Sequence, residues 1–387
     1  MRHGLPRGDR QLTLPDRRVV AVFPDDGTGQ NEAVGRVTLQ TIADRVGVSR
    51  MTVSNAFSRP DQLSELLRQR ILSTAAELGY AGPDPAGRAL ARGATGVIGV
   101  LLTDSLSYAF TDEVATAFMA AIAQEVAATG LALTLLTSSA GQEAIPARDV
   151  PMDGALVYSC DTRSPAIEWL KKRGLPLVLV DQAPATGVTG INIDDRGGAR
   201  AAAQHVVDLG HRRVALLSAD LSGPQGELGD PAAASDAYVT RQRILGWLDA
   251  LTPAGIAPTL LQSAHGNEAS GRDAARVLLT SDRPPTAVLC FCDLMAYGVV
   301  QGALELGLRV PQDLTVVGFD DSPLAQRMQP RLTTVRQDAA EKGRAAAVAI
   351  VAAVQGARVG VPPRVRHLVL PTQLVIRAST APPGVRD

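Results

Sequence analysis

The chain has 387 residues, 45% of them hydrophobic and 20% charged, which are the proportions of ordinary globular protein with room for two or three domains. Its formal net charge of −1 excludes a uniformly basic nucleic-acid-binding protein. Three scattered cysteines favour a reducing compartment over a disulfide framework, and we expect neither a membrane span nor a secretory signal. These features predict a soluble cytoplasmic protein.

The first part of the chain, residues 1–35, is rich in glycine, proline, aspartate and arginine. Its one apolar run, at 19–23, is short. This composition predicts a disordered tail, or a translation start placed too far upstream. An arm that reaches DNA is the alternative, although the tail carries as many acidic residues as arginines.

Residues 38–57 predict two short helices joined by a tight turn. Apolar residues of the first helix recur at i, i+3, i+4 and i+7, Gly47 can end it in the left-handed conformation, and Ser49 can cap the second helix. Such a unit fits a DNA major groove with the second helix inserted, so we predict a sequence-specific DNA binder. A helical hairpin packed on another part of the chain is the alternative.

The outer face of the second helix carries residue types suited to DNA. Arg50 can contact guanine in a bidentate manner, Met51 can touch a thymine methyl, and Asn55 suits adenine. Phosphates, which position a protein without specifying sequence, suit the hydroxyls of Thr38, Thr52 and Ser54. Residues 36–92 hold eight arginines and five acidic residues, an excess of the sign that phosphate requires. Ordinary solvated surface is the alternative for one or two of these positions.

A third helix is predicted at 64–78, with Ser64 as its cap and Tyr80 over the small core. Prolines then indicate an extended linker at 82–85. Residues 86–92 can form one or two helical turns from which Leu90 projects, and packing of Leu90 on the following domain is the alternative.

From residue 96 onward, apolar strands alternate with amphipathic helices, of which one is expected from a Thr111 cap to about residue 129. This alternation predicts parallel sheets covered on both faces. Because the series is too long for one sheet and restarts near residue 193, we predict an α/β core of two doubly wound lobes. Ligands of such sheets bind beyond the carboxyl ends of the strands, here between the lobes. The expected strands are 97–102, 131–136, 154–159, 177–180, 191–193, 214–218, 287–291 and 314–317.

Ordered motifs over residues 37–378 resemble the lactose-repressor (LacI) family of bacterial transcription regulators. Besides the helix pair, they are Leu78-Gly79-Tyr80, Arg88-Ala89-Leu90, Ile98-Gly99-Val100, Asp153-Gly154, Val180-Asp181, Leu209-Gly210-His211-Arg212, Arg243, Gly246-Trp247, Asp293-Leu294-Met295-Ala296, Val317-Gly318-Phe319-Asp320-Asp321 and Leu332-Thr333-Thr334-Val335. The resemblance implies a helix-turn-helix domain joined to a periplasmic-binding-protein-like core. It also implies a homodimer, a pseudo-palindromic operator, repression, and an effector between the lobes, with sugars the commonest class and nucleosides next.

The implied domains follow the motifs. They are a tail (1–35), a helix-turn-helix domain (36–81), a hinge linker and helix (82–94) and a core (95–387), with lobe 1 at about 97–193 and 339–368 and lobe 2 at about 194–338 and 369–385. In the family, a leucine in the position of Leu90 wedges into the minor groove and kinks the operator, while Arg88 and Arg92 would neutralise phosphates. A helix this short is unstable alone, so we expect it to order only in the dimer on DNA, which would let a ligand control DNA binding.

In the cleft, the resemblance points to Arg243 and Asp320 as polar anchors, with Asp181 and Asp293 nearby. A planar donor fork beside carboxylate acceptors suits vicinal hydroxyls. Aromatic residues at strand ends can stack on a ring, ordinary core positions being the alternative: Tyr108, Phe110, Phe291 and Phe319.

Some features depart from the family or carry no chemistry. Cys292 stands where members often have a polar residue, and residues 219–239 form a long segment that is either a flap or, as we favour, a disordered insertion. His205 and His211 are expected to be structural, the latter favoured as a cation near a helix end. The chain ends without a leucine heptad, so a coiled-coil tetramer is not expected.

Three other functions compete with this interpretation. An enzyme is not expected, because the glycine-rich segments fit no nucleotide motif and no nucleophile is paired with a histidine in a recognisable motif. Cys290 and Cys292 lack the second ligand pair of a structural zinc site, so neither a metal nor a cofactor is predicted. A transporter's solute-binding protein shares the two-lobed core, but the helix pair argues against it. A protein co-regulator in place of the small molecule stays open.

Overall fold

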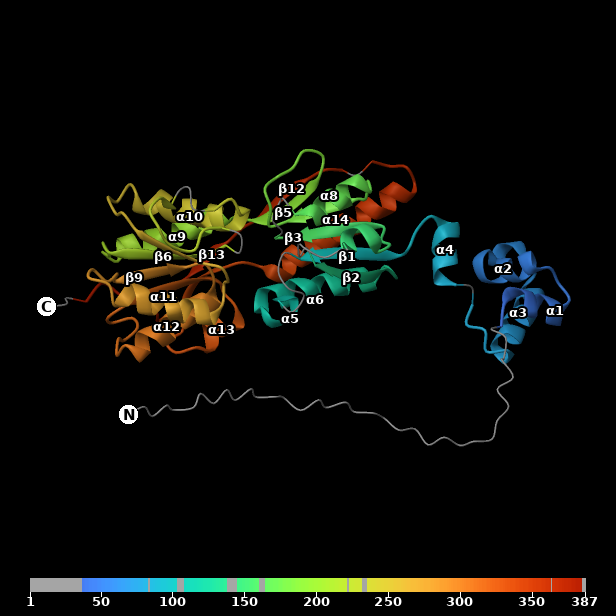
Figure 1. Ribbon diagram of the computed structural model, residues 1–387, viewed down its shortest axis with the longest axis horizontal. Helices are drawn as coiled ribbons and strands as arrows, with labels where there is room; N and C mark the ends of the chain where they lie inside the picture. Colours follow the sequence, from blue (N-terminus) through green and yellow to red (C-terminus); the bar gives the residue numbers. More distant parts are fainter. Residues whose placement is uncertain are drawn as a thin grey trace, which may run out of the picture. The chain divides into compact units, whose positions relative to one another are not determined.

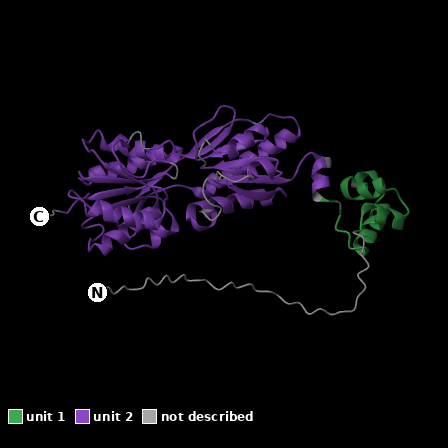
Figure 2. Ribbon diagram, viewed as in Figure 1, with its two compact units in different colours: residues 1–85 green, residues 86–387 purple. Residues whose placement is uncertain are grey.

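The computed structural model divides into two compact units, residues 1–85 and residues 86–387 (Figure 2). The predicted tail lies outside the described residues. Each unit has its own hydrophobic core. The structure describes residues 37–82, 84–102, 108–137, 145–159, 164–220, 223–231, 235–362 and 364–384.

The first unit contains the predicted helices α1 (Leu39–Val46), α2 (Arg50–Ser58) and α3 (Glu65–Glu77), with a short turn η1 (Pro60–Gln62) before α3. Gly47 ends α1 with φ 78°, and the Ser49 hydroxyl accepts the N–H of Thr52 at 3.0 Å. Both predicted signals of the tight turn are therefore confirmed. Each helix contributes apolar side chains to one small core, among them the fully buried Ile42, Val53 and Ile71.

The hinge segment forms the helix α4 (Pro85–Arg92) in the single chain. That this helix orders only in the dimer on DNA stays a prediction. Proline is preorganised for the first helical position, and Gly93 closes the helix in the left-handed conformation with φ 64°. These two end signals favour helix formation within the segment itself.

Lobe 1 is a parallel sheet in the order β12-β5-β4-β3-β1-β2 (Figure 1). Helices α6 and α14 pack together over one face, and α7 and α8 cover the other. Its elements are β1 (Val97–Leu102), α5 (Tyr108–Thr111), α6 (Glu113–Ala127), β2 (Ala132–Thr137), α7 (Pro146–Asp149), β3 (Gly154–Tyr158), α8 (Pro165–Lys172), β4 (Leu177–Val180), β5 (Thr189–Ile193), α14 (Ala339–Arg358) and β12 (His367–Leu370).

Lobe 2 has the strand order β13-β11-β10-β9-β6-β8-β7, parallel except at its two edge strands. Helices α9 and α10 cover one face and α11 and α12 the other (Figure 1). Its elements are α9 (Asp195–Asp208), β6 (Val214–Ala219), β7 (Gly226–Leu228), α10 (Tyr238–Leu251), β8 (Thr259–Ser263), α11 (Glu268–Leu279), β9 (Ala287–Cys290), α12 (Asp293–Glu305), β10 (Thr315–Asp320), α13 (Pro323–Arg327), β11 (Thr333–Arg336) and β13 (Gln373–Val375).

The chain passes between the lobes after β5, after β11 and after β12, so the carboxyl ends of strands from both sheets meet where the lobes adjoin. The predicted α/β core of two doubly wound lobes is confirmed. None of the helices in the described ranges has the length and apolarity needed to cross a bilayer.

Two local expectations were wrong. Thr111 ends α5, and Asp112 caps α6 instead, because its carboxylate accepts the N–H of Ala115 at 2.8 Å. The long segment 219–239 is not simply a disordered insertion, since its described part includes β7, which pairs antiparallel with β8. An edge strand this short gives almost no periodicity by which a sequence can reveal it.

Candidate functional site

The N-terminal end of α2 is open to solvent. Arg50 is exposed and the Met51 side chain is 68% exposed, as expected for residues that reach base edges first. Asn55 is half-buried, and its amide donates to Oε1 of Gln62 at 3.2 Å. This bond uses one of the two N–H groups of the amide, so a base contact through the other N–H group does not require its loss.

The three predicted phosphate contacts differ in what their hydroxyls already do. Thr38 caps α1, where its hydroxyl accepts the N–H of Thr41. The Thr52 hydroxyl lies 2.8 Å from that of Ser49. Ser54 is half-buried on α2. Thr38 and Thr52 thus serve the helix termini, and any phosphate contact would use their remaining hydrogen-bonding capacity.

Leu90 projects from α4 with 86% of its side chain exposed, so the alternative that it packs on the core is wrong. Both Arg88 and Arg92 are exposed on the same helix. The helix therefore presents one apolar side chain to solvent, which matches an apolar wedge for a DNA groove, and carries the two cations on its other face.

The segment between α4 and β1 is anchored on lobe 1 by Asp153. Its carboxylate accepts the backbone N–H of Thr95 at 2.6 Å and that of Gly96 at 2.9 Å, and Arg358 at the end of α14 donates to it at 2.7 Å. Burial alone would raise the pKa of Asp153, but these hydrogen bonds outweigh it and the pKa is lowered. The charged form of Asp153 thus connects α14 to the start of the core.

A pocket of about 210 Å³ lies between the lobes, beside the starts of α6 and α12. Asp112 belongs to its lobe 1 wall, while Asp293 and Asp320 belong to its lobe 2 wall. Next to it, Glu113 of lobe 1 accepts hydrogen bonds from Arg327 at 2.8 Å and from the N–H of Leu324 at 3.0 Å, both of lobe 2. The pocket is smaller than the ~300–1,000 Å³ typical of drug-sized ligands, so it suits a small polar molecule.

A row of hydrogen-bonded, mostly buried polar side chains, here called the polar chain, connects the two lobes next to this pocket. On the lobe 1 side, the Lys342 ammonium of α14 donates to Asp181 at 2.6 Å and to Oε1 of Gln337 at 3.0 Å. Gln337 in turn donates to Asp320 of lobe 2 at 2.6 Å. Asp181 and Asp320 also have positive φ values, of 56° and 126°, a costly conformation that functional sites often retain.

On the lobe 2 side, the chain continues through Arg243. Its Nε donates to Asp195 at 2.9 Å, its Nη1 donates to the carbonyl of Phe291 and lies 3.9 Å from Asp320, and its guanidinium is 3.6 Å from the Phe319 ring centroid. Burial raises the pKa of Asp195 to about 6 despite the opposing effect of Arg243. Two of the guanidinium donors of Arg243 that were expected to bind a ligand therefore already form hydrogen bonds within the protein. The sequence alone did not indicate these bonds.

The remaining expected cleft residues behave differently. Asp293 lines the pocket, but its carboxylate accepts the N–H of Ser322 at 2.8 Å and the hydroxyl of Thr334 at 2.5 Å, and burial raises its pKa to about 7. Phe110 is 69% exposed. The Tyr108 side chain lies outside the described part of the chain. Asp293 therefore holds the loop after β10 in place as well as facing the pocket.

The departures noted in the sequence have structural explanations. Cys292 is buried and its thiol donates to the carbonyl of Gly266. His211 is buried between the Thr286 hydroxyl at 2.8 Å and the carbonyl of Ala381 at 2.9 Å. Burial lowers the pKa of His211, which disfavours the cationic form considered from the sequence, while its two hydrogen bonds agree with a structural role. Among the described residues, no group of three metal-ligating side chains is placed to hold an ion.

The exposed helix α2, the hinge helix α4 and a polar pocket between two lobes are the features of a DNA-binding regulator with a ligand-binding domain. Residues 38–82 match the family described as bacterial regulatory proteins, lacI family, and residues 203–380 match the periplasmic binding protein-like domain.

Known proteins resemble the chain along most of its length. An HTH-type transcriptional regulator of Mycolicibacterium smegmatis is 38% identical over 329 residues, 80% of this chain and 89% of that protein. The lac repressor dimer bound to operator and the anti-inducer ONPF has a TM-score of 0.71 at 27% identity, covering 89% of this chain and 99% of that one. The CelR–cellobiose complex has a TM-score of 0.63 at 27% identity, covering 89% and 100%. The chain belongs to the LacI family of bacterial transcriptional regulators.

Proposed function

We propose that the chain represses transcription as a homodimer on a pseudo-palindromic operator, and that a small polyhydroxylated ligand between its lobes controls this binding. The observation that carries the ligand class is that two buried carboxylate oxygens lack a partner in the network that Gln337, Lys342 and Arg243 connect to Asp320 of the pocket wall. Oδ1 of Asp181 and Oδ2 of Asp195 accept no hydrogen bond from any described group. Buried acceptors are nearly always satisfied, so hydroxyl donors of a carbohydrate or nucleoside would complete them.

The relatives support the same assignment. One similar structure contains cellobiose, and another is a dimer on operator DNA. In this chain we assign base contacts to Arg50, Met51 and Asn55, and the minor-groove wedge to Leu90. The regulators' names indicate a role without catalysis, and such a regulator would act in the cytoplasm, where bacterial DNA lies.

Control of DNA binding would act through the hinge segment. A ligand held by residues of both lobes changes how the lobes close, as at the Glu113–Arg327 contact. The lobe 1 side carries Asp153, which holds the N–H groups of Thr95 and Gly96 immediately after the hinge helix. Closure would therefore alter the presentation of α4 and of Leu90 on it.

The test is a thermal-shift screen of the full-length protein against glucose, cellobiose, ribose, adenosine and cytidine. A ligand that binds only the folded protein raises its midpoint by an amount set by about RT ln(1 + [L]/Kd). The shift should disappear in Asp320→Asn, which keeps an acceptor for Gln337, and persist in Asp249→Asn, where a surface pair with Arg196 is changed instead. A shift that Asp320→Asn leaves intact would place the ligand elsewhere and contradict the proposal.

A further inference from the structure

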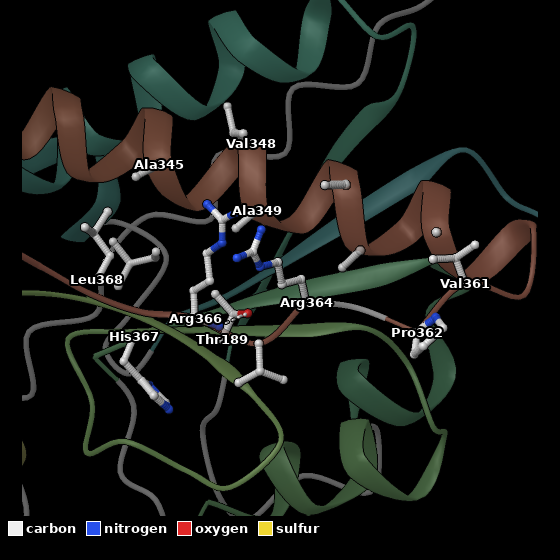
Figure 3. Close-up of a pocket in the computed structure, with 15 residues that line it drawn as sticks. Thr189, Ala345, Val348, Ala349, Val361, Pro362, Arg364, Arg366, His367 and Leu368 are labelled. Carbon is white, nitrogen blue, oxygen red and sulfur yellow. Dashed lines mark hydrogen bonds between the residues drawn. The ribbon is translucent and has the colours of Figure 1, made fainter.

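A larger cavity lies on lobe 1, away from the inter-lobe pocket. Its volume is about 910 Å³, and it separates α14 from residues 361, 362 and 364–368, which lead into and begin β12 (Figure 3). One wall is formed by small apolar side chains of α14, including Ala345, Val348 and Ala349. Val361, Val365 and Leu368 contribute apolar surface from the other side. The volume lies within the ~300–1,000 Å³ of ordinary small-molecule sites.

The charged groups of this cavity are all basic. Arg364 and Arg366 both extend from the segment before β12 towards α14 (Figure 3). No acidic residue lines the cavity, and neither guanidinium forms an ion pair or a hydrogen bond with a described residue. By contrast, Arg344 and Arg358 of α14 pair with Glu341 and Asp153 at 2.8 Å and 2.7 Å. Two neighbouring cations without a carboxylate repel each other, and a bound anion would relieve this repulsion.

The apolar walls define the rest of the ligand. Val348 is 58% exposed, Val361 56% and Val365 40%, so these side chains leave much of their surface in water. Burying that surface would contribute roughly 25 cal/mol for each Å² covered. An inorganic anion alone would neutralise the charges of the two arginines but leave the apolar walls exposed to water. A neutral apolar molecule would cover the walls but leave the arginine charges without a counterion.

We propose that this cavity binds an amphiphilic organic anion. A carboxylate or phosphate group would lie between Arg364 and Arg366, and an unbranched hydrocarbon body would lie against α14. The occupant would contact the helix that also carries Arg358, the partner of Asp153. The site is independent of the inter-lobe pocket, because the two share no lining residue.

The test is isothermal titration calorimetry of the full-length protein with decanoate and with decyl phosphate, each below its micelle concentration. Decanol and inorganic phosphate supply the body and the anion separately. At least one amphiphilic anion should bind about ten-fold or more tighter than either part, a difference of ~1.4 kcal/mol. The preference between decanoate and decyl phosphate identifies the anionic group. Absence of binding by both anions would overturn the proposal.

Variants locate the binding. The double substitution Arg364→Gln, Arg366→Gln should weaken the anion about ten-fold or more. Val348→Trp should block it by filling the cavity from an exposed position. Arg344→Gln on the same helix, outside the cavity lining, is the matched control and should bind as the wild type does. Unchanged affinity in both the double variant and Val348→Trp, with melting temperatures like that of the wild type, would refute the site.

Discussion

Substitution of Lys342 by methionine tests whether the polar chain between the lobes is integral to the fold. The Lys342 side chain is 1% exposed and that of Asp181 is 7% exposed, and their charged atoms lie 2.6 Å apart. Methionine keeps the length and apolar body of lysine but removes the cation. Asp181 would then be a buried carboxylate without its partner, and Gln337 would lose a donor.

The expected cost follows from this burial. Breaking a buried ion pair by removing one partner costs about 3–5 kcal/mol, because the remaining charge is uncompensated. Arg344 is the matched control, because it lies on the same helix α14 but forms its ion pair, with Glu341, on the surface. The Arg344 side chain is 44% exposed and that of Glu341 is 47% exposed. An exposed pair contributes about 0–1 kcal/mol, so Arg344→Met should change stability little.

The assay is urea unfolding of the full-length variants followed by circular dichroism. Lys342→Met should lower the unfolding midpoint much more than Arg344→Met does. Adding Asp181→Asn to Lys342→Met removes the unpaired charge and should recover part of the loss. The reasoning is refuted if Lys342→Met and Arg344→Met unfold at the same urea concentration, or if Asp181→Asn recovers nothing.

Three further predictions concern DNA and pH. Asn55→Ala should cost about 1–3 kcal/mol at one base position and relax specificity there, measured by operator variants in a fluorescence anisotropy titration; a uniform loss across sequences would count against base contact. Leu90→Ala should weaken operator binding and reduce operator bending in a circular-permutation gel assay while leaving the melting temperature unchanged, because the side chain is 86% exposed. Folding raises the pKa of Asp293 from 3.8 to about 7, so its contribution to stability is full below pH ~4 and lost as pH rises towards 7. Asp293→Asn should remove this pH-dependent part of the free energy of unfolding. Parallel curves of unfolding free energy against pH for the wild type and the variant would disprove the raised pKa of Asp293.

Local signals in the sequence predicted the DNA-binding unit well. Gly47 and Ser49 act within one turn of the chain, and the structure shows both in their expected roles. Apolar runs likewise predicted β1 to β6, β9 and β10, because a strand covered on both faces is apolar along its length. The strands β7, β8, β11, β12 and β13 were not predicted. The cap of α6 was predicted one residue too early, because Asp112 rather than Thr111 caps this helix.

The polar chain could not be predicted in the same way. Lys342 lies in an alanine-rich helix where a lysine is usually solvated, and its partner Asp181 is 161 residues away in the sequence. One signal was available, since Lys342 shares the spacing i, i+4, i+8 with Ala346 and Ile350, which are fully buried. Arg243 was identified through resemblance, but its engagement with Asp195 depends on how α9 and α10 pack.

Operator affinity of the full-length protein, with and without the ligand found by thermal shift, tests the central claim most directly. The operator would first be selected from random DNA, and its dissociation constant measured by fluorescence anisotropy at fixed salt. We expect a two-fold symmetric sequence whose affinity the ligand changes by about ten-fold or more in the wild type, ~1.4 kcal/mol of coupling, and not in Asp320→Asn. A ligand that binds the wild type and leaves operator affinity unchanged would contradict the account.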